Sequence, residues 1–200
     1  MPECSIFAGV DEVGRGAWAG PVSVGIACAS RERLTELMND EFAVSLIDDS
    51  KKLKPKDRVI ALNYVAQYFT YAVGSASARE CDEFGMISAL KLASTRAIDE
   101  LDTTPSVFFL DGNVNYLGVA NVINVVKGDT KLVAIAAASV AAKVSRDTWM
   151  VQLDSEFPFW NFASNKGYPS VGHRRALGVV GLSSIHRVSW SYVDTMNLRL

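Results

Sequence analysis

Cysteine, long apolar runs and net charge are all scarce in this sequence of 200 residues. The three cysteines, Cys4, Cys28 and Cys81, are an odd number without paired spacing, which argues against a disulfide framework or a zinc cluster. Free thiols in a reducing compartment fit better. No apolar run is long enough to span a membrane, and the N-terminus lacks the basic segment and apolar run of a signal peptide. We therefore expect a cytoplasmic protein without membrane attachment.

The net charge is only −2 and the pI is about 5.7, which argues against a protein that coats nucleic acid indiscriminately. The charge is uneven, because residues 1–126 carry 11 Lys and Arg against 17 Asp and Glu, whereas residues 127–187 carry 8 against 4. An acidic metal site beside a basic flank would give this division, and so would chance. With no repeat, low-complexity tract or linker, residues 1–200 are expected to form a single domain.

Hydrophobic periodicity predicts an α/β domain. Strands are expected at residues 6–13, 21–30, 69–78, 107–110 and 120–126, the first two forming a hairpin. Helices are expected at 31–38, at 56–68, from an N-cap at Ser88 through Leu101, and over the Ala-rich residues 131–156. An aromatic loop at 157–169 and short helices at 171–177 and 183–188 would form a helical C-terminal extension. This order indicates one mixed five-stranded sheet flanked by helices.

The most informative stretch is residues 9–21, with the sequence GVDEVGRGAWAGP. An apolar strand ends in two carboxylates, Asp11 and Glu12, and Arg15 then stands between Gly14 and Gly16. Carboxylates at a strand end can hold a hard cation, and glycines let a phosphate approach the main chain. Most acidic pairs are merely solvated, but unpaired carboxylates on an inner strand are costly. Strand alternation sends the two side chains to opposite faces, so either the strand bends or Glu12 contributes through its carbonyl.

Two single aspartates follow later strands. Asp111 ends an apolar run and precedes Gly112, at a place where α/β sheets tend to carry functional groups, although an Asp-Gly turn would look the same. Asp129 lies just before the Ala-rich helix, where an aspartate is often a purely structural N-cap.

Three further motifs have side chains suited to binding a polyanion or a sugar. On the segment 136–147, Ser139, Lys143 and Asp147 are four residues apart and share a helix face, so Ser139 and Lys143 could grip a phosphate while Asp147 pairs with a cation. The loop motif DSKKL at 49–53 carries Lys51, whose charge suits phosphate neutralisation. A solvated helix face and a solvated loop are the alternatives. The motif NKGY at 165–168 ends in Tyr168, and His173, which follows it, could touch a phosphate, whereas His186 is expected to be structural.

Together these motifs resemble the ribonuclease HII family. The similarity comprises DEVGRG followed by AGPV, the DSKKL loop, the Asp-Gly at a strand end, the Asp before an AAAS helix, and NKGY, in the expected order from about Val10 to Val188. The chain departs from the family at Ala17-Trp18, where members usually carry Pro-Leu. That departure lies beside the Gly-Arg-Gly and is expected to tune substrate contact.

The resemblance implies a ribonuclease H-like fold and a metal-dependent endoribonuclease. The expected substrates are RNA/DNA hybrids and duplex DNA with a single embedded ribonucleotide, cut on its 5′ side to leave 3′-hydroxyl and 5′-phosphate ends. Two divalent cations, Mg²⁺ or Mn²⁺, would bind four catalytic carboxylates: Asp11, Glu12, Asp111 and Asp129. Substrate contacts are implied at Gly14, Arg15, Gly16, Lys51, Ser139, Lys143 and Tyr168, the last against the ribose at the cleavage junction. A monomer without an obligate protein partner is expected.

Two alternatives stay open. A DNA endonuclease of the same superfold, such as a junction resolvase, would use a similar carboxylate cluster, although the Gly-Arg-Gly and Tyr168 matches argue against it. A non-catalytic module that binds hybrids would not need four intact carboxylates, and all four are present.

Overall fold

Five strands form one mixed sheet at the centre of the structure, a computed structural model that describes residues 5–47 and 53–198. The strands are β1 (Ile6–Val13), β2 (Val22–Ser30), β3 (Thr70–Ala76), β4 (Val107–Asp111) and β5 (Val122–Val125). Their order across the sheet is β3-β2-β1-β4-β5. β2 is antiparallel to both of its neighbours, and β4 is parallel to both of its own. The predicted five-stranded mixed sheet and the β1–β2 hairpin are confirmed.

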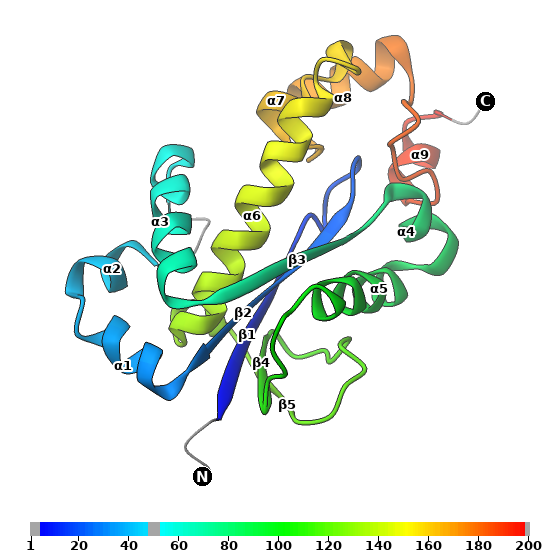
Figure 1. Cartoon of the computed structure of the whole chain (residues 1–200). Helices are drawn as coiled ribbons and strands as arrows, with labels where there is room; N and C mark the ends of the chain where they lie inside the picture. Colours follow the sequence, from blue (N-terminus) through cyan, green and yellow to red (C-terminus); the bar gives the residue numbers. More distant parts are fainter. Residues whose placement is uncertain (1–4, 48–52, 199–200) are drawn as a thin grey trace.

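Helices cover both faces of this sheet (Figure 1). On one face α5 (Met86–Asp99) packs on β2 and β3, and on the other α6 (Val133–Leu153) crosses β1 and β2 with α3 (Pro55–Tyr68) beside it. The shorter helical segments are α1 (Arg31–Met38), α2 (Glu41–Leu46), α4 (Ala78–Phe84), η1 (Gly128–Thr130), η2 (Pro158–Trp160), α7 (Phe162–Asn165), α8 (Val171–Val180) and α9 (Ser191–Thr195). Within the residues described, no helix is both long and apolar enough to cross a bilayer.

The alternation along β2 divides the interior into two apolar cores. Val22, Val24 and Ile26 point toward α5 and join one core, whereas Ala27 points toward α6 and α3 and joins the other. Both faces of β2 are therefore buried, and small residues occupy the face that meets α6. This pattern is the alternation of faces that a β-strand imposes.

The helix α6 lies unusually close to the sheet because two strand residues have no side chain. A Cβ added at Gly9 would lie 2.0 Å from the carbonyl carbon of Ala134, and one added at Gly25 would lie 2.4 Å from the carbonyl oxygen of Ala138. The alanines of α6 supply small side chains at the same contact. This close approach brings the segment before α6, which carries Asp129, to the carboxyl ends of β1 and β4.

The structure corrects several predicted elements. α6 begins after Leu132 as its N-cap, so Asp129 does not cap it and lies in η1 instead. Residues 183–188, predicted as a helix, form turns, and His186 makes an isolated bridge to Ala19. The helix expected to start at Ser88 starts at Met86, because Gly85 with φ 76° separates it from α4.

Other short segments differ from the prediction because they depend on local capping and tertiary packing rather than on long periodic patterns. α2, α4 and α9 were not predicted, and the expected aromatic loop contains η2 and α7. α4 is stabilised by a reciprocal capping box between Ser77 and Glu80. Helices of four to seven residues are too short to leave a periodic apolar face in the sequence.

The packing of α6 predicts the effect of adding one methyl group. Gly9→Ala should lower the free energy of unfolding by about 1–3 kcal/mol, because backbone atoms of α6 occupy the space that its Cβ needs. Urea unfolding measures this. Gly178→Ala in α8, where an added Cβ meets nothing within 4 Å, is the matched control and should raise stability by roughly 0.5–1 kcal/mol. A stable Gly9→Ala protein would contradict the close approach.

Candidate active site

Three carboxylates meet where β1, β4 and η1 come together. Asp11 lies on β1, Asp111 ends β4 and Asp129 lies in η1, and one oxygen of each is within 4.8 Å of the other two. β1 and β4 are parallel neighbours, so their carboxyl ends lie at the same edge of the sheet. Asp11 and Asp129 are 3% and 8% exposed, and Asp111 is half-buried. The structure therefore gathers three of the four predicted carboxylates at one partly closed point.

Main-chain groups orient this three-aspartate cluster. The N–H of Glu12 donates to Oδ1 of Asp11 at 2.8 Å, and the N–H of Gly128 donates to Oδ1 of Asp111 at 2.6 Å. A side chain at position 128 would interfere with this approach, because an added Cβ would lie 2.4 Å from Cδ1 of Ile135. Glycine avoids this contact. Backbone geometry thus holds one oxygen of Asp11 and one of Asp111 without a bound cation.

The donor set of the cluster fits a hard divalent cation. It offers only carboxylate oxygens, without a histidine or cysteine ligand, which is the chemistry that Mg²⁺, Mn²⁺ and Ca²⁺ prefer over Zn²⁺. Carboxylates held this close repel one another, and a bound cation relieves that repulsion. The cluster is therefore suited to hold a metal.

The side chain of Glu12 lies apart from the three-aspartate cluster. β1 keeps its regular pairing with β2 through Val13, so the strand does not bend and alternation sends Glu12 to the other face. There its carboxylate accepts hydrogen bonds from the hydroxyl of Tyr116 at 3.0 Å and from Arg15 at 3.3 Å. Burial, with the nearby carboxylates of Glu12 and Asp11, raises the pKa of Tyr116, so this hydroxyl stays a donor.

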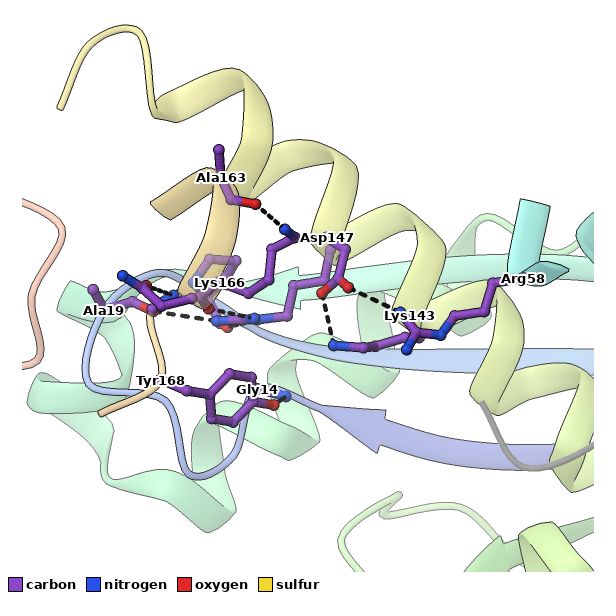
Figure 2. Close-up of polar contacts among 12 residues, drawn as sticks. Gly14, Ala19, Arg58, Lys143, Asp147, Ala163, Lys166 and Tyr168 are labelled. Atoms are coloured by element: carbon purple, nitrogen blue, oxygen red, sulfur yellow. Dashed lines mark hydrogen bonds and ion pairs between the residues drawn. The ribbon is translucent and has the colours of Figure 1, made fainter. Parts of the chain in front are cut away.

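The Gly-Arg-Gly and NKGY motifs meet at one hydrogen bond. The N–H of Gly14, a residue with φ 83°, donates to the hydroxyl of Tyr168 at 3.1 Å (Figure 2). The ring of Tyr168 lies 5.7 Å from Nζ of Lys143 and 5.4 Å from Cζ of Arg146. Two motifs that are 154 residues apart in sequence thus form one surface.

Two buried arginines, which the sequence did not single out, hold this surface in place. Arg146 and Arg187 are 1% and 0% exposed, and burial lowers the pKa of both groups, for Arg146 to about 10, so both remain charged at neutral pH. Arg146 donates to the carbonyls of Ala19, Pro21 and Lys166, and Arg187 donates to those of Gly14, Arg15 and Gly20. Only the fold reveals this role, because the acceptors are backbone groups.

A pocket of about 530 Å³ opens beside Tyr168. Its wall carries Arg58, Lys143 and Lys166 with one carboxylate, Asp147. Asp147 pairs with Lys143 at 2.8 Å and with Arg58 at 3.3 Å, as predicted for a carboxylate that partners a cation (Figure 2). Three cations against one anion leave this basic pocket positively charged, which suits a phosphate group.

The remaining predicted residues fall in different environments. Arg15 and Gly16 are exposed beside the cluster, whereas Ser139 is 3% exposed and lies among the core residues of α6. Lys51 lies outside the described residues. The predicted phosphate contact of His173 is wrong, because this side chain is fully buried and bound to His186.

Trp18, one of the two residues that differ from the family's usual Pro-Leu, contacts the C-terminal region. Ala17 is fully buried, and the ring of Trp18 stacks on Tyr192 of α9 with centroids 4.1 Å apart. The hydroxyl of Tyr192 also donates to the carbonyl of Trp18 at 3.1 Å. The expected influence on substrate contact is thus indirect, since Trp18 attaches the loop to α9.

Comparisons with known proteins agree with this geometry. A family model described as Ribonuclease HII matches residues 8–193. Ribonuclease HII of Streptomyces avermitilis is 45% identical over 193 residues, covering 96% of this chain and 79% of that protein. The ribonuclease H2 from Pyrococcus horikoshii OT3 has a TM-score of 0.76 at 25% identity, covering 96% of each chain. Bst-RNase HIII in complex with Mn²⁺ shares the fold, with a TM-score of 0.73 at 17% identity over 98% of this chain and 73% of that one. The predicted ribonuclease H-like fold is confirmed.

Cation binding by the three-aspartate cluster predicts a thermal shift that does not depend on activity. Mg²⁺ or Mn²⁺ at about 100 times its Kd should raise the Tm of the parent protein by roughly 5–10 °C. Asp11→Asn and Asp129→Asn should lose most of that shift, and without metal their Tm should match or exceed that of the parent because repulsion is relieved. Differential scanning fluorimetry measures this, with Asp154→Asn, away from the cluster, as the control. Equal shifts in all four proteins would contradict the metal assignment.

Proposed function

The chain belongs to the ribonuclease HII family, and we propose that it is a divalent-metal-dependent endonuclease acting on ribonucleotides paired to DNA. Its family and fold support ribonuclease H activity, which the non-catalytic alternative lacks. The proposed substrates are RNA/DNA hybrids and duplex DNA with one embedded ribonucleotide, cut on its 5′ side to leave a 3′-hydroxyl and a 5′-phosphate. The observation that carries metal dependence is the three-aspartate cluster at the edge of the sheet.

In this proposal Asp11, Asp111 and Asp129 hold two divalent cations, Mg²⁺ or Mn²⁺. When bound, such cations activate the attacking water and stabilise the leaving oxygen. Glu12 would contribute its main-chain carbonyl, because its carboxylate is bound to Tyr116 and Arg15. The side-chain bonds of Glu12 would then keep that carbonyl fixed.

Ribose recognition is proposed for Gly14, Arg15, Gly16 and Tyr168. The Tyr168 hydroxyl accepts the N–H of Gly14, so its own proton is available to donate to a 2′-hydroxyl, the group that distinguishes RNA from DNA. Gly16 is exposed, and a Cβ there would meet nothing within 4 Å of the protein itself. The space above Gly16 is thus available to a sugar–phosphate backbone.

The basic pocket is proposed to bind a backbone phosphate next to the ribose. Lys143 lies 5.7 Å from the centre of the Tyr168 ring, and Arg58 and Lys166 line the same pocket. Asp147 holds Lys143 and Arg58 in place without cancelling both charges. Lys51 and Ser139 stay predicted substrate contacts. The monomeric state and the cytoplasmic location also stay predictions.

A duplex with a single embedded ribonucleotide tests the proposed function. The parent protein with Mg²⁺ or Mn²⁺ should cut once, on the 5′ side of the ribonucleotide, and EDTA should abolish cleavage. Asp11→Asn should lower kcat by at least about 100-fold while the circular dichroism spectrum stays unchanged. An all-DNA duplex and a DNA junction are the control substrates. Cleavage of either at a comparable rate would restore the DNA endonuclease alternative.

The phosphate role of Lys143 predicts a change in salt dependence. Lys143→Ala should weaken binding of hybrids of every sequence alike and reduce the slope of log K against log [salt] by about one unit. Fluorescence anisotropy across a salt series, with a catalytically inactive background, measures the slope. Lys91→Ala, on α5 across the sheet, is the matched control. An unchanged slope would mean that Lys143 does not neutralise a phosphate and only pairs with Asp147.

The ribose role of Tyr168 and Gly16 predicts two separable losses. Tyr168→Phe keeps the ring and should cost roughly 0.5–1.5 kcal/mol in kcat/KM on the single-ribonucleotide duplex, and Tyr168→Ala should cost more. Gly16→Ala should lower kcat/KM without a change in Tm, because its Cβ meets only the substrate. Smaller losses are expected on long hybrids, where neighbouring riboses compensate. Parent-like rates for both Tyr168 variants would remove Tyr168 from recognition.

A further inference from the structure

Two buried histidines are linked to the main chain of Tyr168. His173 is in the first turn of α8 and His186 is in the turn before Arg187, with exposures of 0% and 3%. Their Nε2 atoms are 2.9 Å apart. The rings of Phe162 and Trp160 enclose the pair at centroid distances of 5.5–5.8 Å. Polar groups so deeply buried require a hydrogen-bonding role.

The groups at the two ends of this histidine pair fix which ring nitrogens donate and which accept. The N–H of Ser183 donates to Nδ1 of His186 at 2.8 Å, and Nδ1 of His173 lies 2.9 Å from the carbonyl oxygen of Tyr168. A backbone N–H can only donate and a carbonyl can only accept. His186 therefore carries its proton on Nε2 and donates it to His173, which carries its own proton on Nδ1 and donates it to Tyr168.

The hydrogen bonds from Ser183 N–H to His186, from His186 to His173 and from His173 to Tyr168 can all form only when both rings are neutral. A second proton on His186 would sit on Nδ1, where it would replace the bond from the N–H of Ser183 and leave only the hydroxyl oxygen of Ser183, 2.7 Å away, as an acceptor. A second proton on His173 would sit on Nε2 and face the N–H of His186. Burial, the largest cause, lowers the pKa of both rings, for His186 to about 3, in agreement with this geometry.

The neighbouring residue closes the chain of contacts into a ring. Arg187 follows His186 directly and donates to the carbonyl of Gly14 at 2.8 Å. The N–H of Gly14 in turn donates to the hydroxyl of Tyr168 at 3.1 Å. The main chain of Tyr168 is therefore tied to His186 through His173, and the loop that its hydroxyl meets is tied to the next residue of the same turn.

We propose that His173 and His186 are positioning residues that set the place of the Tyr168 hydroxyl relative to Gly14, and so determine discrimination between ribose and deoxyribose. This inference rests on the ribose-reading role proposed above for Tyr168. The pair touches neither the metal site nor the substrate. It acts by fixing the carbonyl of Tyr168, from which the ring and its hydroxyl project.

A double-mutant cycle tests this coupling. His186→Leu removes the donor to His173 and should lower kcat/KM on the single-ribonucleotide duplex by about threefold to tenfold, the loss expected for one misplaced hydrogen bond. In a Tyr168→Phe background the same substitution should change kcat/KM less than about twofold, because the hydroxyl it positions is already absent. Equal losses in both backgrounds would mean that the histidines merely stabilise the fold, and would overturn the proposal.

A matched control separates positioning from stability. Leu37→Ala, in α1 and in the apolar core that includes residues of α3 and α6, should lower Tm to a similar extent without changing kcat/KM. If Leu37→Ala and His186→Leu reduce kcat/KM alike at equal loss of Tm, the histidines have no special role.

Nitrogen-15 NMR of the parent protein tests the donor and acceptor assignment of the two histidines, even where a variant fails to fold. The expected result is the Nε2–H tautomer for His186 and the Nδ1–H tautomer for His173, with both rings neutral at pH 7. The opposite tautomers would overturn the proposal. Absence of ribonuclease activity in the parent would instead refute the proposed function, and the tautomer measurement would still report on the chain.

Discussion

The surface around Tyr168 depends on two buried guanidinium groups bonded to backbone carbonyls. The loop from Gly14 to Pro21 turns sharply, and several of its carbonyls point inward, where unpaired acceptors would be costly. Arg146 and Arg187 donate hydrogen bonds to these carbonyls. Each can reach several acceptors because a guanidinium presents five N–H donors in a rigid fork. A lysine could not reach as many acceptors at fixed angles. The same bonds attach the loop to α6 and to the turn at His186, so loop, helix and C-terminal region are connected through buried hydrogen bonds.

The candidate active site therefore combines two kinds of support. The three-aspartate cluster lies at the carboxyl ends of β1 and β4, where the parallel strands and the close approach of α6 fix the carboxylates. The proposed ribose-reading surface stands on loops, which have few constraints of their own and are held by side chains instead. Rigid strands suit metal ligands, because the distances between the ligand atoms must stay constant. A loop held by buried hydrogen bonds can present main-chain N–H and C=O groups to a substrate.

The C-terminal region is part of this arrangement rather than an appendage. Trp18 stacks on Tyr192 of α9, His186 bridges to Ala19, and His173 of α8 contacts the carbonyl of Tyr168. Each contact leads from a residue beyond position 157 to the loop or to Tyr168. The extension that the sequence predicted thus serves to position the site.

The sequence by itself determined the sheet, the hairpin and the Ala-rich helix, because strand alternation and small-residue runs are local patterns, and it singled out Asp11 and Asp111 as strand-end carboxylates. Strand alternation sends Asp11 and Glu12 to opposite faces unless the strand bends, and the regular register of β1 shows that it does not bend. Local pattern favoured an N-cap for Asp129, and only the tertiary structure placed this residue in η1 beside Asp11 and Asp111. The structure alone also revealed the contacts of Arg146 and Arg187. Most of their partners are backbone carbonyls more than 100 residues away in sequence, and the residue type does not indicate which carbonyl the fold will bring to it.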